Sequence, residues 1–212
     1  MIIRKIFPNI QSAHIVRNCT SERCSHSIHG HSTTVELLFE AKNLDNAQMV
    51  MDFGLMKGPI KQLIDSMDHC YLLCTKDKYD FREFITKECD RYIAMPFNPS
   101  AEMLATWLFA AIQNIIGRTS FRNGEDPQLV LKTVIYHETA SGSAEADASD
   151  VEHLFYNRGY SLDQVVFSEG VKKDWGDELK DIDRDNHYLS NKPVNAPVTA
   201  IINPEIKKQI EL

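Results

Sequence analysis

Residues 31–41 carry the pattern that most restricts how this chain folds, an alternation of side chains over a run rich in β-branched residues. Side chains of an extended chain alternate between its two sides, so the segment predicts a strand with one face toward a core. The residues that share this face are His31, Thr33, Val35, Leu37 and Phe39. Such a strand requires neighbouring strands and a layer that covers its apolar face.

Three further segments predict partner strands. Residues 1–16 predict a strand bent at Pro8, and residues 128–138 predict a second strand with alternating side chains. A turn at 43–46, followed by a short strand at 48–52, would form a hairpin with the central strand.

In two places the apolar period changes to that of a helix. Residues 53–67 predict an amphipathic helix that begins near Gly58, because the following proline fits only in a first turn. A second helix is expected after Ser100, its N-cap, and should stop at Gly117. A short helix is expected within 71–98. The order strand, strand, helix, helix, strand predicts an α+β fold with an antiparallel sheet.

The chain divides into two expected parts. Residues 1–150 hold these elements, with an edge strand or a loop at 141–150. Residues 151–212 form a C-terminal extension of unknown role, with modest helical segments at 151–190 and a proline-containing, extended stretch at 193–212.

Composition narrows the class of protein. The 212 residues include 23 Lys and Arg against 30 Asp and Glu, and the net charge of −7 argues against nucleic-acid binding. No apolar run is long enough to cross a membrane, and the N-terminus lacks the apolar core of a signal peptide, so we expect a cytoplasmic protein. The five cysteines, an odd number, argue against a disulfide scaffold.

His29-Gly30-His31 is the segment richest in chemistry. At the start of a strand, His29 and His31 point to the same face and together suit one Zn²⁺. Gly30 lets backbone or ligand approach closely. His14, at the end of the first expected strand, is the candidate third ligand. Three protein ligands leave the fourth position of a catalytic zinc for substrate.

Other interpretations stay open on these residues alone. His26 competes with His14 as the third ligand. A structural zinc site of Cys24, His26, His29 and His31 is a second arrangement, although it lacks the Cys-x-x-Cys pair typical of such sites. His29 and His31 are also compatible with two exposed strand residues that bind nothing.

Several short motifs in order resemble the 6-pyruvoyltetrahydropterin synthase / 6-carboxytetrahydropterin synthase family over about residues 5–140. They are Ser12-Ala13-His14, Cys24 followed by His29-Gly30-His31, Met51-Asp52-Phe53 with Lys57, Met67-Asp68-His69, Asn98-Pro99-Ser100-Ala101-Glu102 and Tyr136-His137-Glu138-Thr139. One such motif is weak evidence, whereas the series in order is specific.

The resemblance implies the tunnelling fold (T-fold), a four-stranded antiparallel sheet with two helices on one face, here followed by a C-terminal extension. It implies a closed homo-oligomer, typically a hexamer, with active sites at subunit interfaces. The implied substrate is 7,8-dihydroneopterin triphosphate. The chain departs from compact members in its longer stretch between His69 and Asn98 and in its continuation beyond Glu138.

The resemblance also implies the role of individual residues. The zinc ligands are His14, His29 and His31, the catalytic base is Cys24, the proton relay is Asp68 with His69, and the anchor of the pterin ring is Glu138. Candidates for the triphosphate site, by proximity to motifs alone, are Arg17, Arg23 and Lys57.

Two reactions occur within the family. The segment Ile28-His29-Gly30-His31-Ser32 looks closer to bacterial enzymes that form 6-carboxy-5,6,7,8-tetrahydropterin with loss of acetaldehyde and triphosphate, for queuosine and 7-deazaguanine synthesis. The alternatives are a 6-pyruvoyltetrahydropterin synthase, which eliminates only triphosphate, and a non-catalytic zinc- or pterin-binding protein.

Overall fold

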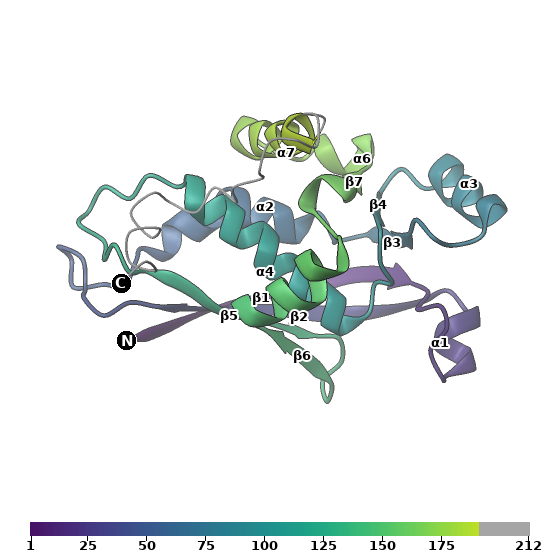
Figure 1. Ribbon diagram of the computed structural model, residues 1–212, viewed down its shortest axis with the longest axis horizontal. Helices are drawn as coiled ribbons and strands as arrows, with labels where there is room; N and C mark the ends of the chain where they lie inside the picture. The colour runs from purple at the N-terminus through teal and green to yellow at the C-terminus, as the bar shows by residue number, and fades with distance from the viewer. Residues whose placement is uncertain (191–212) are drawn as a thin grey trace.

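Seven strands form one mixed sheet in the order β6-β5-β2-β1-β3-β4-β7 (Figure 1). The computed structural model describes the backbone of residues 1–190 and the side chains of residues 1–187, so the stretch expected at 193–212 lies outside the described residues. The strands are β1 (Ile2–His14), β2 (His29–Glu40), β3 (Cys70–Cys74), β4 (Tyr92–Met95), β5 (Val130–His137), β6 (Ser143–Ala146) and β7 (Val166–Phe167).

The expectation of a four-stranded sheet is wrong in number, although it holds for one half of the sheet. β1 pairs with β2, β2 with β5 and β5 with the edge strand β6, all antiparallel. β3 joins β1 and β4 joins β3 in parallel, and β7 pairs antiparallel with β4. The added strands escape sequence analysis because β3 is buried over its whole length and so lacks alternation, and β7 has only two residues.

The pairing of β1 with β2 determines where the site forms. The bend expected in the first strand is present, because the register shifts between Phe7 and Ile10 and Asn9 has a positive φ of 63°. Such a bulge changes the direction of the strand beyond it. After the bulge, the register places His14 opposite His29.

The expected short strand at 48–52 is wrong, since this segment forms turns and bends. The Asp45 carboxylate accepts hydrogen bonds from the amides of Ala47 and Met49, at 2.9 and 2.8 Å. An aspartate that binds its own neighbouring amides favours a turn over a strand.

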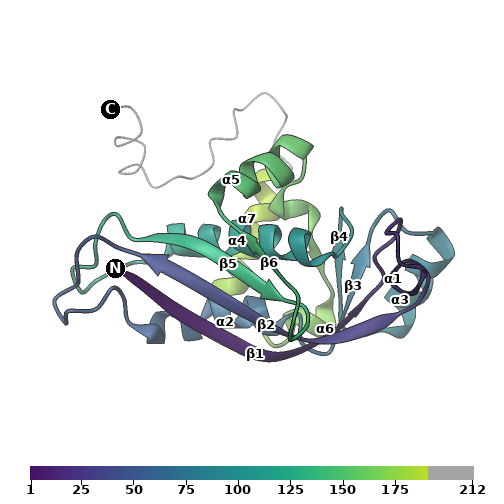
Figure 2. The same ribbon diagram turned by 90° about the horizontal axis from the view of Figure 1, so that it is seen from below.

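Helices α2 (Pro59–Asp65) and α4 (Ala101–Arg118) cover one face of the sheet (Figure 2). The start of α4 is as expected, because Ser100 Oγ accepts the Met103 amide, but the helix continues one residue past Gly117. The remaining helices are α1 (Glu22–His26), α3 (Tyr79–Glu88), α5 (Ala148–Asp150), α6 (Glu169–Lys172) and α7 (Asp177–Ser190), with short turns η1 (Phe53–Lys57), η2 (Val151–Phe155), η3 (Tyr156–Arg158) and η4 (Leu162–Gln164).

The segment after residue 150 adds a third layer. α7 lies over α2 and α4 on the side away from the sheet (Figure 1). The Asn114 amide donates to Asn186, and Arg118 pairs with Asp185 at 3.0 Å, which joins α4 to α7. The same segment supplies β7, so it extends both the sheet and the helical layers. The division at residue 150 stays a prediction.

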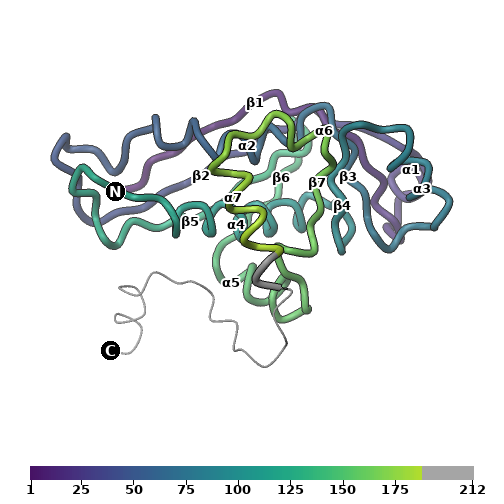
Figure 3. The backbone as a smooth tube through the Cα atoms, turned by 90° about the horizontal axis from the view of Figure 1, so that it is seen from above, coloured from purple at the N-terminus to yellow at the C-terminus, as the bar shows by residue number. Residues whose placement is uncertain are grey.

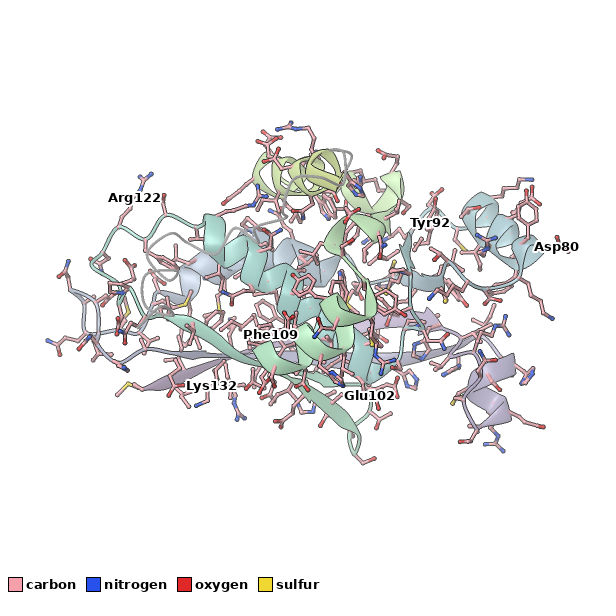
Figure 4. All side chains as sticks on the ribbon, viewed as in Figure 1. Asp80, Tyr92, Glu102, Phe109, Arg122 and Lys132 are labelled. Carbon is pink, nitrogen blue, oxygen red and sulfur yellow. The ribbon has the colours of Figure 1, made fainter. Side chains whose placement is uncertain are left out.

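α1 and α3 both lie at one end of the sheet, and Asp80 marks the outer part of α3 in Figure 4. The two meet through Arg17, whose guanidinium lies 5.4 Å from the centre of the Phe81 ring. The helix expected within 71–98 is therefore present as α3. Among residues 1–190, no helix is long and apolar enough to cross a membrane.

Candidate metal centre

Three histidines converge where the paired ends of β1 and β2 meet the start of α4. The register sets His14 opposite His29 and Ser12 opposite His31, and directly opposed residues share a face of the sheet. That face is the buried one, because Thr33 and Val35, the next residues of the same alternation, are fully buried. The ligand nitrogens of His14, His29 and His31 all lie within 4.8 Å of one another.

Two backbone carbonyls orient the rings. His14 Nδ1 lies 2.7 Å from the Pro99 carbonyl, and His29 Nδ1 lies 3.0 Å from the Ser27 carbonyl. A carbonyl only accepts, so each Nδ1 carries the proton and each Nε2 keeps a free lone pair. This is the outer-shell arrangement that orients histidine ligands in metal sites.

The buried nitrogens of this corner are left without partners. The Nε2 atoms of His14 and His31 are buried and have no hydrogen-bond partner in the described part of the chain. An unpaired buried acceptor is costly unless a ligand satisfies it. Burial, followed by the charge of His29, lowers the pKa of His14 to about 4, so its ring is neutral at neutral pH and competent to bind a metal.

These residues fit a zinc ion. Three neutral imidazoles suit Zn²⁺, whose bonds to nitrogen are about 2.0–2.1 Å long, and the ligand nitrogens here lie within 4.8 Å of one another. Gly30 allows the close approach expected of it, because a Cβ there would lie 2.9 Å from the Ser12 carbonyl oxygen. The other proposed arrangements do not form, since the cluster does not include Cys24 and His26 Nδ1 instead lies 2.7 Å from Ser25 Oγ.

Glu138 lies beside the same corner. One carboxylate oxygen is 3.7 Å from His14 Nε2 and 3.9 Å from His31 Nε2. It continues the alternation of Tyr136, which is buried, whereas His137 turns to the other face and meets Glu36 at 3.0 Å. Glu138 is therefore within reach of anything bound over the histidines. Glu102, labelled in Figure 4, marks the start of α4 at this end of the sheet.

Cys24 lies on α1, next to the end of β1. The Val16 amide donates to the Cys24 carbonyl at 2.9 Å, and the thiol is partly exposed. In the described part of the chain its sulfur makes no hydrogen bond to the histidine corner or to Asp68 and His69.

Arg17, one of the candidates for the triphosphate site, is already bound to partners within the protein. Its guanidinium pairs with Asp77 at 2.9 Å and donates to the Ser25 carbonyl at 2.9 Å. The Asp77 side chain is only 3% exposed, so this is a buried ion pair that fixes α1 against the turn before α3. The other two candidates, Arg23 and Lys57, are exposed.

Asp68 and His69 form a pair in the turn that precedes β3. His69 Nδ1 lies 2.9 Å from Asp68 Oδ2, and the Gln11 amide donates to Asp68 Oδ1 at 2.8 Å. Burial raises the pKa of Asp68, but the hydrogen bonds from Gln11 and His69 outweigh it and hold the pKa below its usual value. The pair adjoins β1 three residues before His14, and no described contact links it to the metal corner of the same chain.

The sequence alone did not reveal two parts of this site. The Pro99 carbonyl orients His14, yet residues 98–100 indicated only a helix start. The second part is Arg91, which donates to the Asp68 carbonyl at 3.1 Å. Every residue has a backbone carbonyl, so the residue types in the sequence do not predict this contact.

Comparison with known proteins shows which family this sequence belongs to. The sequence profile described as 6-pyruvoyl tetrahydropterin synthase matches residues 3–149, which is more than half of the chain. The chain belongs to this family. Its fold is the family's α+β tunnelling fold, enlarged here to seven strands.

The curated relatives that match this chain carry one name. The 6-carboxy-5,6,7,8-tetrahydropterin synthase of Helicobacter pylori is 36% identical over 178 residues, covering 84% of this chain and 88% of that protein. A match of that length reaches beyond residue 150. The protein of the same name from Aquifex aeolicus is 31% identical over 124 residues, covering 56% of this chain and 73% of that one.

A solved structure supports the fold. An uncharacterized protein from Wolinella succinogenes aligns with a TM-score of 0.56 at 19% identity, covering 70% of this chain and 98% of that one. At that identity the likeness concerns the fold alone.

Proposed function

We propose that this protein is a zinc-dependent lyase that converts 7,8-dihydroneopterin triphosphate to 6-carboxy-5,6,7,8-tetrahydropterin, with loss of acetaldehyde and triphosphate. The observation that carries the proposal is the convergence of His14, His29 and His31 on the buried face of the sheet. The names of the curated relatives support this reaction over others in the family. The product would enter queuosine and 7-deazaguanine synthesis.

The three histidines would hold the ion, and three protein ligands would leave a fourth position for substrate. When bound, Zn²⁺ supplies Lewis-acid chemistry that acidifies the bonds next to the hydroxyl groups it holds. The carbonyls of Pro99 and Ser27 engage Nδ1 of His14 and His29, which leaves Nε2 of each neutral ring as the atom that would bind the ion.

Cys24 is the proposed base, because a thiolate accepts a proton from carbon readily. Asp68 holds the His69 ring by Nδ1 and stabilises its charged form, so that His69 passes the proton to and from the thiol. Glu138 is the proposed anchor for the amino and ring N–H groups of the pterin, to which a carboxylate offers two parallel acceptors. Its position beside the histidines supports a role at the substrate.

The assay is incubation of the purified, zinc-loaded protein with 7,8-dihydroneopterin triphosphate, with measurement of acetaldehyde and triphosphate. We expect both products in equal amounts. Triphosphate without acetaldehyde would instead favour the 6-pyruvoyl reaction, and neither product would favour a binding protein.

The role of Cys24 has its own test. Cys24→Ala should abolish turnover while zinc stays bound, because the sulfur is not part of the histidine cluster. Cys19→Ala is the matched control, since Cys19 is a partly exposed cysteine just before α1 whose thiol donates to the Ser21 carbonyl. Loss of zinc from Cys24→Ala would make the thiol a ligand and contradict its role as base.

A closed homo-oligomer, possibly of six chains in the family's manner, is part of the proposal. Within one chain, Asp68 and His69 make no described contact with Cys24, which supports assembly of the site from two subunits. Cys24→Ala and Asp68→Asn, each inactive alone, should regain activity when unfolded together and refolded as mixed oligomers. Mixtures as inactive as the separate variants would place all three residues in one subunit.

A further inference from the structure

We propose that the C-terminal extension, acting through Arg91, holds the turn of residues 66–69 in the conformation that presents Asp68 and His69. Arg91 is then a positioning residue, and the extension serves the reaction although it contributes no reacting group. This inference rests on the proposed function for its kinetic consequences, while the contacts below stand on their own.

The turn itself is in a conformation that needs support. His69 has a φ of 51°, in the left-handed region that residues other than glycine rarely adopt. Its amide donates to the Gln11 carbonyl at 2.6 Å, and the Gln11 amide returns a hydrogen bond to Asp68 Oδ1. A non-glycine residue stays in this region when its surroundings determine the conformation.

Arg91 supplies much of that support. Its Nε donates to the Asp68 carbonyl at 3.1 Å, which is the peptide group joining Asp68 to His69. A second donor, Nη1, reaches the Gly170 carbonyl at 3.0 Å and the Asp174 carboxylate at 2.5 Å. One side chain thus ties the turn to α6 and the residues after it. The Arg91 side chain is only 20% exposed, so these contacts are sheltered from water.

The extension is itself fastened on both sides of Arg91. Ser168 Oγ donates to the Asp90 carbonyl at 2.7 Å and accepts the Tyr92 amide at 3.0 Å. Gly170 packs so closely that a Cβ there would lie 2.1 Å from the Asp90 carbonyl oxygen. Figure 3 shows α6 beside β7 and above β3, in agreement with these contacts.

Beyond α6, the extension reaches the start of the turn. The indole Nε1 of Trp175 donates to Ser66 Oγ at 2.7 Å in a buried contact. The Gly176 amide donates to the Gln62 side chain at 2.9 Å, on the last full turn of α2. The extension therefore holds the turn at Ser66 directly and at Asp68 through Arg91.

These contacts border a groove of ≈ 560 Å³ into which the pair opens. Its lining includes Asp68 and His69, Arg91, and Asp174 and Trp175 of the extension. A shift of the extension would change both the wall of the groove and the place of the His69 ring.

The important part of the Arg91 contact is the hydrogen bond to the turn and not the ion pair. The Asp174 side chain is 61% exposed, and exposed ion pairs contribute little. Arginine bridges because its donors point in fixed, different directions, whereas a lysine has one ammonium group on a flexible stem. Arg91→Lys should therefore keep the charge and lose the simultaneous contact with turn and extension.

The experiment compares four full-length proteins: wild type, Arg91→Lys, Trp175→Phe and Arg118→Ala. Arg118 is the matched control, because it also pairs with an extension carboxylate, Asp185, at similar exposure but away from the turn. Trp175→Phe keeps an aromatic ring but removes the hydrogen bond to Ser66 together with part of the buried ring, and it provides a second test where Arg91→Lys folds poorly. The readouts are hydrogen exchange of the peptide spanning 66–70, zinc content, kcat and KM.

We expect faster exchange at 66–70 in Arg91→Lys and, to a lesser degree, in Trp175→Phe, with full zinc content and with Arg118→Ala like wild type. Because small displacements of catalytic groups cost up to about 100-fold in rate, kcat should fall about 10- to 100-fold in Arg91→Lys with KM little changed. A variant that only weakened the fold would instead lower the amount of active protein and leave the kcat of the folded fraction unchanged.

Exchange at 66–70 that matches the Arg118→Ala control would overturn the proposal, as would faster exchange with an unchanged kcat. Failure of the proposed function is a separate result. If the wild-type protein has no lyase activity, kcat and KM cannot be measured, but hydrogen exchange still decides whether the extension holds the turn.

Discussion

The histidine corner and the Asp68–His69 turn are both candidate parts of one active site, yet they are built in different ways. The corner belongs to two paired strands, and its ring nitrogens are buried. The turn lies before a strand, with side chains that are 38% and 76% exposed for Asp68 and His69. It keeps its shape through contacts from β1, from Arg91 and from the extension.

The strand register therefore fixes the histidine corner, whereas contacts from other segments hold the Asp68–His69 turn in place. Moving one ligand of the corner would require the ladder between β1 and β2 to break, because all pairs from Ile10 to His14 share one register. The turn has no ladder of its own, so each support can be removed singly. Substitutions within the corner should therefore cause large losses of zinc affinity and activity. Substitutions of the residues that hold the turn should cause smaller, graded losses of activity.

Removal of a histidine ligand should give the largest effect. His29→Ala leaves two ligands, and we expect zinc affinity to fall by more than the roughly 10- to 100-fold that loss of a supporting contact costs, with activity lost as well. Titration with a zinc chelator measures the affinity. His26→Ala is the control, because His26 ends α1, three residues before His29, and lies outside the cluster. Stoichiometric, tight zinc in His29→Ala would contradict the ligand set.

Asp68→Asn tests the turn at its most direct point. An amide keeps the size of the side chain but cannot stabilise a charged His69 ring, so kcat should fall about 10²- to 10⁴-fold with zinc content unchanged. Steady-state kinetics on zinc-loaded protein measure this. Asp65→Asn is the matched control, since the Asp65 carboxylate pairs only with Lys61 on the exposed surface of α2. Equal losses in the two variants would remove the special role of Asp68.

Strand alternation was sufficient to place His29 and His31 on one face, because strand geometry is local. Alternation along 31–41 placed His31 on the face of Val35, and the structure confirms that face as the buried one. The same rule correctly separated Glu138 from His137. Strand geometry left His14 and His26 open as the third histidine; the family resemblance named His14, and the pairing of β1 with β2 brings it to the cluster.

The sequence was insufficient wherever distant segments meet. β3, β4 and β7 are short and lie in segments without clear alternation, so the sheet was predicted with too few strands. Arg17 was a candidate for a phosphate ligand, but the buried Asp77 carboxylate engages it. The role of Arg91 depends on carbonyl oxygens, which every residue has, so no pattern of residue types reports it.

The pH dependence of the metal-free protein tests the burial of the corner. His14 has a pKa of about 4 in the folded chain against 6.5 when unfolded, so between these values the unfolded chain binds more protons. Stability is then complete above pH 6.5 and falls as the pH drops toward 4, by up to about 3 kcal/mol from this residue. Urea unfolding of metal-free protein at pH 7 and pH 4.5 measures the change. His14→Gln, which has no titrating ring, should show a smaller change, and an equal change would mean that His14 is not buried as a neutral ring.

Gly30→Ala gives the smallest effect and tests the ladder itself. The added Cβ would meet the Ser12 carbonyl oxygen at 2.9 Å, so β1 and β2 must move apart at the histidines. Overpacking costs about 1–3 kcal/mol, offset in part by the 0.4–1 kcal/mol or so that alanine gains through the unfolded chain, for a net loss of about 1 kcal/mol.

Zinc affinity should fall along with that stability, because the displaced strands carry all three ligands. Gly142→Ala is the control, since a Cβ there meets only the Thr139 side chain, outside the β1–β2 pair. Urea unfolding and chelator titration of both variants provide the measurements. Wild-type zinc affinity in Gly30→Ala would show that the histidines still bind zinc when their strands move apart. The claim that strand register fixes the corner more rigidly than the turn would then be wrong.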